Sequence, residues 1–342
     1  MRFMYAIHRI LVAVKEPRAK GSAALDKAAR LAHALGAEVR LFHAIADPIY
    51  LDAAGSLAQA YPRLEQDRRG AYRDGLERLA APLQRRGIRV GVSVEWDFPV
   101  YEAIVREAAH FEADLIVAES HARAHHAPWL LRFTDWELLR RSPVPVLLVK
   151  SRRAYRRPKV LAALDPARAF GKPANLDAEI LRYGSTVASA LHGALHAVHA
   201  YSPGGQAPLA AALRRRRTAS GVEFGGGSAT SNARGRREAD AAWRARSALH
   251  ETLRWSAIPA PRVHLVGSPP AAAIEQTLNE ISASILVIGT LARSGFRRLF
   301  VGNTAERLLD RIRCDVLAVK PIEFRNVIAR EPRGLQTFAL PE

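Results

Sequence analysis

ILVIGTLARSGFRRLFVGNTAERLL, residues 285–309, is the stretch that decides the fold we expect for this chain. It begins with an apolar run rich in β-branched residues, which is typical of a strand buried on both faces of a parallel sheet. Gly289 ends this run. Gly302 precedes Asn303, a good helix N-cap, and Glu306 follows at the spacing of a capping box. The stretch therefore predicts a buried strand, a basic glycine-containing loop and a helix.

A loop of this kind, leading from a strand into a helix, is suited to binding phosphate. The first turn of a helix presents unpaired N–H groups and the positive end of the helix dipole, and glycines let the backbone approach an anion. Arg293, Arg297 and Arg298 add positive charge to the loop. Because glycines also serve ordinary turns, the pattern alone leaves a phosphate site and a structural loop as equal alternatives.

Length and composition indicate a two-domain protein without disulfides. A chain of 342 residues favours two domains, and its single cysteine, Cys314, excludes an internal disulfide. No apolar run reaches transmembrane length, and the N-terminal MRFMYAIHRILVAV has too short an apolar core for a secretory signal. We therefore expect a soluble cytoplasmic protein without a membrane span.

The net charge of +18 comes mostly from arginine and favours anionic ligands such as nucleotides. No stripe of arginines interleaved with aromatic residues and no DNA-binding motif is present in the sequence. We therefore do not expect a nucleic-acid partner, and an Ala/Arg-rich coding bias is the alternative explanation of the charge.

The first half of the chain alternates between strand and helix patterns, which predicts a parallel sheet covered on both faces. We expect strands at residues 10–14, 39–45, 88–96, 114–118 and 146–150, and helices at residues 21–35, 63–86, 99–109 and 135–141. Residues 47–62 are expected to be irregular and residues 119–133 to form a loop. Thr134 and Glu137 have the spacing of a capping box for the last helix.

The same alternation then starts again. In the second half we expect strands at residues 160–164, 194–201, 263–267, 285–288 and 316–320, and helices at residues 174–191, 237–258 and 270–281. The predicted organisation is a first repeat (1–150), a basic linker (151–159), a second repeat (160–322) and a tail (323–342). Residues 202–237, rich in Gly, Ser, Ala and Arg, are predicted to be a flexible insertion in the second repeat.

An internal repeat supports this division, because the ends of the two halves align without a gap at an offset of 170. Leu138-Leu139 matches Leu308-Leu309, and the closing strands match as well. The glycines do not repeat: Glu119 stands opposite Gly289, and Arg132 stands opposite Gly302. The fold is therefore expected twice, and the phosphate loop only in the second repeat.

Two such repeats, with GNTAERLL and RCDVLAVKP closing the second, resemble a tandem universal stress protein of the E type. TDWELLR followed by PVPVLLVK is similar to the end of the first repeat in those proteins. The resemblance covers almost the whole chain. It implies an α/β fold with two tandem five-stranded parallel-sheet repeats of Rossmann-like topology, related to the adenine-nucleotide alpha-hydrolases. It also implies a role in stress tolerance.

The resemblance also implies a candidate ATP site, since many family members bind ATP through G-x-x-G-x9-G-[S/T] and an acidic residue after the first strand. Carried over, the motif and its supporting positions fall on Asp165, Ala200, Gly289, Ala292, Arg293, Gly302, Asn303 and Thr304. Ala292 stands where the second glycine belongs, and Asn303 where Ser or Thr belongs. In the first repeat Lys15 replaces the acidic residue, so we expect nucleotide in the second repeat only.

Other clusters of polar residues give weaker signals. His121, His125 and His126 lie on one predicted loop, but a metal site needs converging ligands, so surface histidines are favoured and no metal is expected. His196 and His199 are expected to pack at a strand. No nucleophile–base pair or carboxylate dyad is recognisable, so we expect no catalytic residues.

Three hypotheses follow. The first is a non-enzymatic stress protein that binds nucleotide in its second repeat. The second is a nucleotide-free scaffold that binds a partner protein, or an anionic or lipid-like ligand, in the cleft between the repeats. The third, a hydrolase or phosphotransferase, is disfavoured because the Walker pattern is absent. The paired repeats predict an intramolecular pseudo-dimer, which would lessen the need for self-association.

Overall fold

The computed structural model describes residues 7–46, 49–51, 56–120, 128–166, 175–202, 229–254, 256–290, 308–309, 311–324 and 337–339. The first repeat contains β1 (Arg9–Ala13), α1 (Ala23–Leu35), β2 (Glu38–Ile45), β3 (Ile49–Leu51), α2 (Ser56–Gln84), β4 (Val90–Trp96), α3 (Val100–His110), β5 (Leu115–Glu119), α4 (Pro128–Arg141) and β6 (Val146–Val149). The second contains β7 (Lys159–Leu164), α5 (Leu176–Ala190), β8 (Ala194–Ala200), α7 (Ala229–Leu253), the 3-10 turn Ala260–Arg262, β9 (Val263–Val266), α8 (Pro270–Glu280), β10 (Ile285–Gly289) and β11 (Asp315–Val319).

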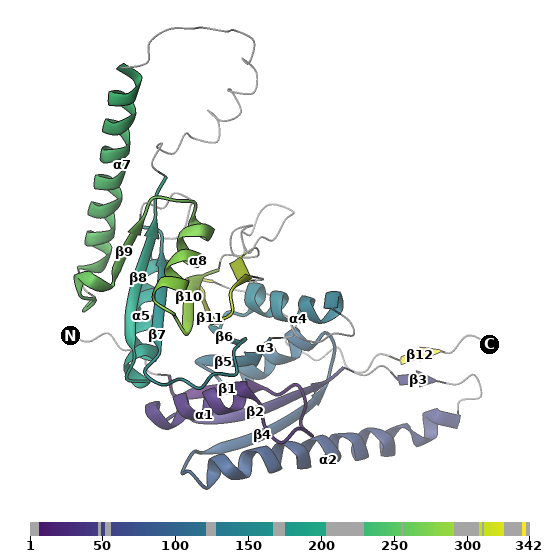
Figure 1. Cartoon of the computed structure of the whole chain (residues 1–342). Coiled ribbons are helices and arrows are strands. Elements are labelled where there is room, and N and C mark those ends of the chain that lie inside the picture. Colours follow the sequence, from purple (N-terminus) through teal and green to yellow (C-terminus); the bar gives the residue numbers. More distant parts are fainter. Residues whose placement is uncertain are drawn as a thin grey trace, which may run out of the picture.

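Ten strands form one continuous sheet in the order β4-β2-β1-β5-β6-β11-β10-β7-β8-β9 (Figure 1). All neighbours within each repeat are parallel, as the alternation of strands and helices predicts. The chain therefore has the predicted tandem α/β fold, with five strands of the large sheet from each repeat.

The two halves of the sheet meet where β6 and β11 pair in antiparallel orientation. Leu147 lies opposite Leu317, its own equivalent at the offset of 170, so an approximate twofold axis passes between these two residues. Both strands are completely buried, because each repeat supplies the neighbour that the last strand of the other lacks. The repeats thus form a pseudo-dimer within one chain.

Helices cover both faces of the sheet. One hydrophobic core lies between the sheet and α1, α2, α5 and α7. The other lies between the opposite face and α3, α4 and α8, together with Leu308, Leu309 and Ile312. Burial on both faces explains why the central strands read as continuous apolar runs in the sequence.

The first helix shows how local sequence sets the boundaries of these elements. Ser22 has extended backbone and its side chain accepts a hydrogen bond from the N–H of Leu25, so α1 begins there. Gly36 ends the helix with φ of 68°, a left-handed conformation that favours glycine.

Three helices begin earlier than the sequence predicts. The segment predicted to be irregular contains β3 and the start of α2 at Ser56, and α7 begins at Ala229, within the predicted insertion. The capping box proposed for Thr134 and Glu137 is wrong, because α4 begins at Pro128 and Thr134 lies inside it. Glu137 instead pairs with two arginines in the next turn, so the polar spacing reflects ion pairs on the helix surface.

Part of the C-terminal tail also has a defined place. Thr337–Ala339 forms β12, which pairs in parallel with β3 in a small separate sheet. This pair lies beyond the N-terminal end of α2, away from the large sheet (Figure 1). The tail therefore returns to the first repeat, which the sequence did not indicate.

Candidate functional site

Each repeat has a topological switch point at the carboxyl ends of its strands. In the first repeat β1 lies between β2 and β5, and in the second β7 lies between β8 and β10. The chain leaves the neighbouring strands in opposite directions there, and open α/β sheets bind ligands in the crevice that results. These two edges are therefore where ligand sites are expected.

The second switch point brings together three of the residues that the sequence singled out. Leu164 pairs with His199, so Asp165 and Ala200 follow side by side at the ends of their strands. Ala162 pairs with Val287, and continuing this register by two residues places Gly289 beside Leu164. One edge of the sheet thus holds the acidic residue, the second-strand position and the first glycine.

Asp165 is buried at this edge, with 8% of its surface exposed. Its backbone N–H donates to both carboxylate oxygens of Asp177 on α5, at 3.1 and 3.2 Å. Its own Oδ2 is buried and has no hydrogen-bond partner among the described residues. A buried carboxylate oxygen without a donor is unfavourable, so a ligand that brings a hydroxyl would stabilise it.

Gly289 has a packing reason to be glycine. A Cβ atom built on it would lie 2.5 Å from Cδ2 of Leu176, a side chain that is fully buried at the start of α5. Such a distance is far below ordinary contact, so a larger residue would displace the helix start. The structure therefore explains this glycine by the approach of α5, whether or not a phosphate also lies nearby.

The rest of the predicted phosphate loop, Ala292, Arg293, Gly302, Asn303 and Thr304, lies outside the described residues, and so does the capping box with Glu306. The residue that leads into it is well held. Thr290 donates its N–H to the carbonyl of Val319 at 2.9 Å and its hydroxyl to the carbonyl of Leu139 at 3.3 Å. The loop thus leaves the sheet from a point anchored to both repeats.

The first switch point contains a cavity of about 550 Å³, which the sequence did not lead us to expect. Apolar side chains from β2, α3 and α4 form much of its wall, including Phe42, Ile45, Val100, Ile104 and Leu138. Its polar residues are Lys15, Glu16, Arg18, His43, Tyr72, Glu119, Thr134 and Asp135. The position of the switch point could have indicated it, because the crevice depends on topology rather than on glycines.

The polar residues of this cavity differ from those of the second repeat. Lys15, at the position of Asp165, is exposed, so the strand-end position that carries a carboxylate in the second repeat carries a cation here. Asp135 is buried and accepts a hydrogen bond from the hydroxyl of Ser120 at 3.2 Å. The ring of His43 is held by the carbonyl of Val14, 2.8 Å from its Nδ1. The cavity therefore offers charges of both signs above an apolar wall.

A polar cluster at the junction between the repeats was also missed. Asp315, fully buried at the start of β11, accepts hydrogen bonds from Lys27 of α1 and, at 2.5 Å, from the hydroxyl of Tyr155. Its other oxygen accepts the N–H groups of Lys150 and Ser151, at 2.8 and 2.9 Å. The sequence did contain one signal of this cluster, because Asp315 is an acidic residue at the start of an apolar strand. We call Lys27, Tyr155 and Asp315 the junction cluster.

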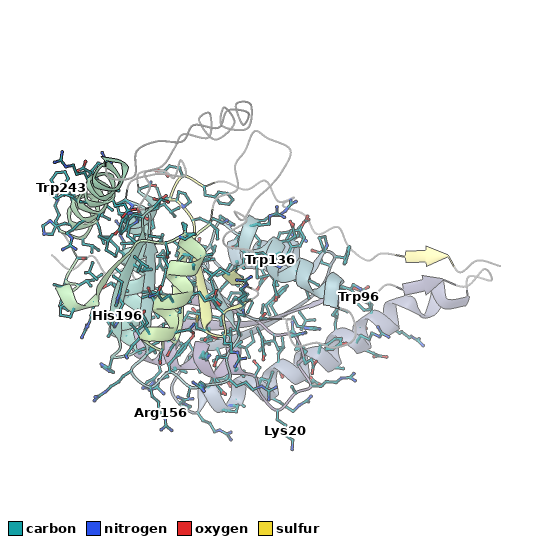
Figure 2. All side chains as sticks on the ribbon, turned by 45° about the horizontal axis from the view of Figure 1, so that its top comes forward. Lys20, Trp96, Trp136, Arg156, His196 and Trp243 are labelled. Atoms are coloured by element: carbon teal, nitrogen blue, oxygen red, sulfur yellow. The ribbon has the colours of Figure 1, made fainter. Side chains whose placement is uncertain are left out.

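The strand histidines of the second repeat, His196, His199 and His264, lie against other groups of the protein. His196 on β8 (labelled in Figure 2) lies with its Nδ1 3.1 Å from Nε2 of His264. Burial, together with the neighbouring charges of His264, Arg262 and Lys159, lowers the pKa of His196 to about 4. His199 lies with its Nδ1 3.2 Å from the carbonyl of Leu164.

Neither metal ligation nor thiol chemistry is supported in the described part of the chain. No three His, Cys, Asp or Glu side chains converge there in a way that could hold a metal ion, and His121, His125 and His126 lie outside it. Burial, with the charge of Asp315, raises the pKa of the Cys314 thiol to about 12, so this thiol is unreactive.

None of the described helices is long and apolar enough to cross a membrane. The long helices α2 and α7 are too polar.

Comparison with known proteins gives a consistent result. The sequence model of the universal stress protein family matches residues 6–150 and 159–320. The chain is 25% identical over 333 residues to universal stress protein E of Escherichia coli K12, covering 94% of this chain and 97% of that one. It is 24% identical over 265 residues to a universal stress protein E homolog of Haemophilus influenzae, covering 77% and 79% of the two chains.

Solved structures show the same fold. A protein of unknown function from Pseudomonas aeruginosa PAO1 superimposes with a TM-score of 0.64 at 24% identity, covering 93% of this chain and 94% of that one. A universal stress protein from Archaeoglobus fulgidus superimposes with a TM-score of 0.59 at 17% identity, covering 93% and 98%. Both cover the two repeats together.

Proposed function

This chain belongs to the universal stress protein family, and we propose that it is a non-enzymatic stress-response protein that binds ATP or another nucleotide in its second repeat. The observation that carries the proposal is the carboxylate of Asp165, whose Oδ2 is buried without a hydrogen-bond partner among the described residues. It lies at a switch point, where α/β sheets bind nucleotides.

A nucleotide supplies what this carboxylate lacks. The ribose carries hydroxyl donors, and a hydrogen bond to a buried carboxylate contributes about 1.5–3 kcal/mol. Ala200, beside Asp165, would offer backbone groups to an adenine ring, and its methyl side chain is small. Arg293 would neutralise phosphate charge, and the backbone around Gly302, Asn303 and Thr304 would donate N–H groups.

The first repeat lacks this arrangement, because an exposed Lys15 replaces Asp165 and carries the opposite charge. The two positions therefore make a matched pair of variants. Isothermal titration of the full chain with ATP should show one site. Asp165→Ala should weaken it about tenfold or more, as expected for the loss of one charge-assisted hydrogen bond.

Lys15→Ala serves as the control and should leave ATP affinity unchanged. Weakening by Lys15→Ala but not by Asp165→Ala would place the nucleotide in the first repeat, and no measurable binding by the wild type would reject nucleotide binding. Gly302→Asp, which adds a negative charge to the loop, should abolish binding as well. Turnover of ATP by the purified wild type, lost in Asp165→Ala, would overturn the non-enzymatic part of the proposal.

A second candidate is favoured by the cavity of the first repeat. Its apolar wall and mixed charges suit an amphiphilic ligand better than a nucleotide, and this would make the protein a nucleotide-free scaffold. Ile104→Trp should fill the cavity. If ligands extracted with the purified protein and identified by mass spectrometry disappear in this variant while ATP binding is absent throughout, the second candidate is correct.

A further inference from the structure

A cavity of about 660 Å³ lies at the seam between the two repeats, outside both switch points. Four segments line it: α1, the turn after α2, the linker and the end of α5. The lining residues are Asp26, Lys27, Arg30, His33, Ala34, Arg86, Ala154, Tyr155, Ala190, Leu191 and His192. Its volume is typical of sites for small molecules. Both repeats contribute to it, so it exists only when they are docked.

The walls of this seam cavity are basic. Arg30, His33, Arg86 and His192 are exposed on its walls, and Asp26 is the only acidic residue among those lining it. Lys27, on its floor, is already neutralised by Asp315. The cavity therefore has a positive field that favours an anion.

Arg30 and Arg86 form no ion pair or side-chain hydrogen bond within the described part of the chain. Some other helical arginines do have a carboxylate partner, as Arg182 has Glu179 at 3.0 Å. A guanidinium is planar and presents donors in a fork that matches phosphate oxygens. Two unpaired guanidinium groups facing one cavity are therefore suited to a phosphate-bearing ligand.

The floor of the cavity is fixed in place by the junction cluster. Lys27 donates to the carbonyl of Ser151 at 2.6 Å as well as to Asp315, and its Nζ lies 4.6 Å from the centre of the Tyr155 ring. A preformed site loses less entropy on binding than a mobile one. Arg156, further along the same linker, projects outward from the surface (Figure 2), which extends the basic surroundings.

We propose that the seam cavity binds a small, multiply charged phosphoanion, held by Arg30 and Arg86 of the first repeat where α1 and α2 face the end of α5. The competing explanation is that His33, Arg86 and His192 only complement the negative ends of three helices. Arg30 lies in the middle of α1 and gains nothing from that effect. The proposal is independent of nucleotide binding at Asp165.

The test is isothermal titration of the full chain with inorganic tripolyphosphate at low salt. The wild type should bind, and Arg30→Gln combined with Arg86→Gln should weaken binding at least tenfold. The ligand should also raise the melting temperature of the wild type, since the cavity exists only in the folded chain, but not that of the double variant. Gly302→Asp, which should abolish nucleotide binding, should leave this binding unchanged, which separates the site from the nucleotide site.

Arg78→Gln combined with Arg236→Gln is the matched control, because both arginines are exposed on helices outside the cavity. Equal weakening by this control would show that only net charge matters and would overturn the proposal. Absence of binding by the wild type would overturn it as well. Flotation with phosphatidic acid vesicles shows whether the bound phosphate belongs to a lipid headgroup or to a free anion. If only the cavity variant fails to float with the vesicles, the ligand is a lipid headgroup. If the cavity variant melts early, Arg30→Gln alone repeats the measurement.

Discussion

The ammonium group of Lys27 and the carboxylate of Asp315, 288 residues apart in the chain, form a buried ion pair where the two repeats meet. Their side chains are 4% and 0% exposed. Tyr155 shares the same carboxylate, and burial together with the charge of Asp315 raises its pKa well above the ordinary value, which keeps the hydroxyl a donor. One acidic residue of the second repeat thus joins α1 and the linker of the first.

Asp315→Ala should therefore destabilise the whole chain. Removing one partner leaves Lys27 buried without its counter-charge, and such losses cost about 3–5 kcal/mol. Urea unfolding followed by circular dichroism measures the change in the free energy of unfolding. Arg9→Ala, which breaks the exposed pair of Arg9 with Glu112, should cost less than about 1 kcal/mol. Similar costs for the two variants would mean that the junction cluster contributes no more than a surface pair.

Gly289→Ala should be destabilising through contact with Leu176 rather than through any ligand. The added methyl would lie 2.5 Å from Leu176 Cδ2, and overpacking of this kind costs about 1–3 kcal/mol. Gly21→Ala meets nothing within 4 Å and should change stability by less than about 0.5 kcal/mol.

The same position separates packing from phosphate binding. The double variant Gly289→Ala/Leu176→Ala should lose less free energy of unfolding than the two single variants lose together. The cavity left by Leu176 accepts the new methyl group, so the two effects are not additive. If ATP binding survives in this double variant, Gly289 serves packing alone. If the losses of unfolding free energy in the two single variants are additive, contact with Leu176 is not the reason for glycine at position 289.

The sequence predicted the sheet well because its signals are local. Val146-Leu147 and Val316-Leu317 repeat at one offset, and buried strands read as apolar runs. The antiparallel joining of these two strands was less visible, although a completely apolar last strand indicates that it has a neighbour. The early starts of α2, α4 and α7 were missed because these segments carry no clear apolar stripe.

The site was predictable only where residues follow strands directly. Asp165 and Ala200 meet because parallel strands end at one edge, and this follows from the fold alone. The two cavities and the junction cluster combine segments distant in sequence, such as Lys27 with Asp315, and no motif marks them. Long-range contacts of this kind depend on packing that periodicity does not encode.

Because of Lys320, the stability of the folded chain should depend on pH above neutrality. Its Nζ donates to the carbonyl of Arg140 at 2.9 Å, and burial, with the charge of Arg140, lowers the pKa of Lys320 to about 7. Between pH 7 and 10.5 the unfolded chain holds a proton that the folded chain lacks, so this group makes stability rise with pH across that window. Lys320→Met should flatten the rise measured by urea unfolding at pH 7.5 and 9.5. Lys20→Met, on an exposed lysine, should not.

Because of His196, the stability of the folded chain should fall at acidic pH. Its pKa in the folded chain is about 4 against an ordinary value of 6.5, chiefly because of burial. As the pH falls through 6.5 the unfolded chain takes up a proton that the folded chain refuses, so the stability contributed by this group is lost progressively down to about pH 4.

His196→Gln should therefore lose less stability than the wild type between pH 7.5 and 5, measured by urea unfolding at each pH. The glutamine keeps a hydrogen-bonding partner for His264 but has no proton to gain. Burial also lowers the pKa of His264, while Glu280 opposes the shift, so His264→Gln should act in the same direction. His250→Gln, at an exposed position of α7, is the control and should leave the pH profile unchanged. Parallel profiles for wild type and His196→Gln would show that His196 takes up its proton equally in the folded and unfolded chains.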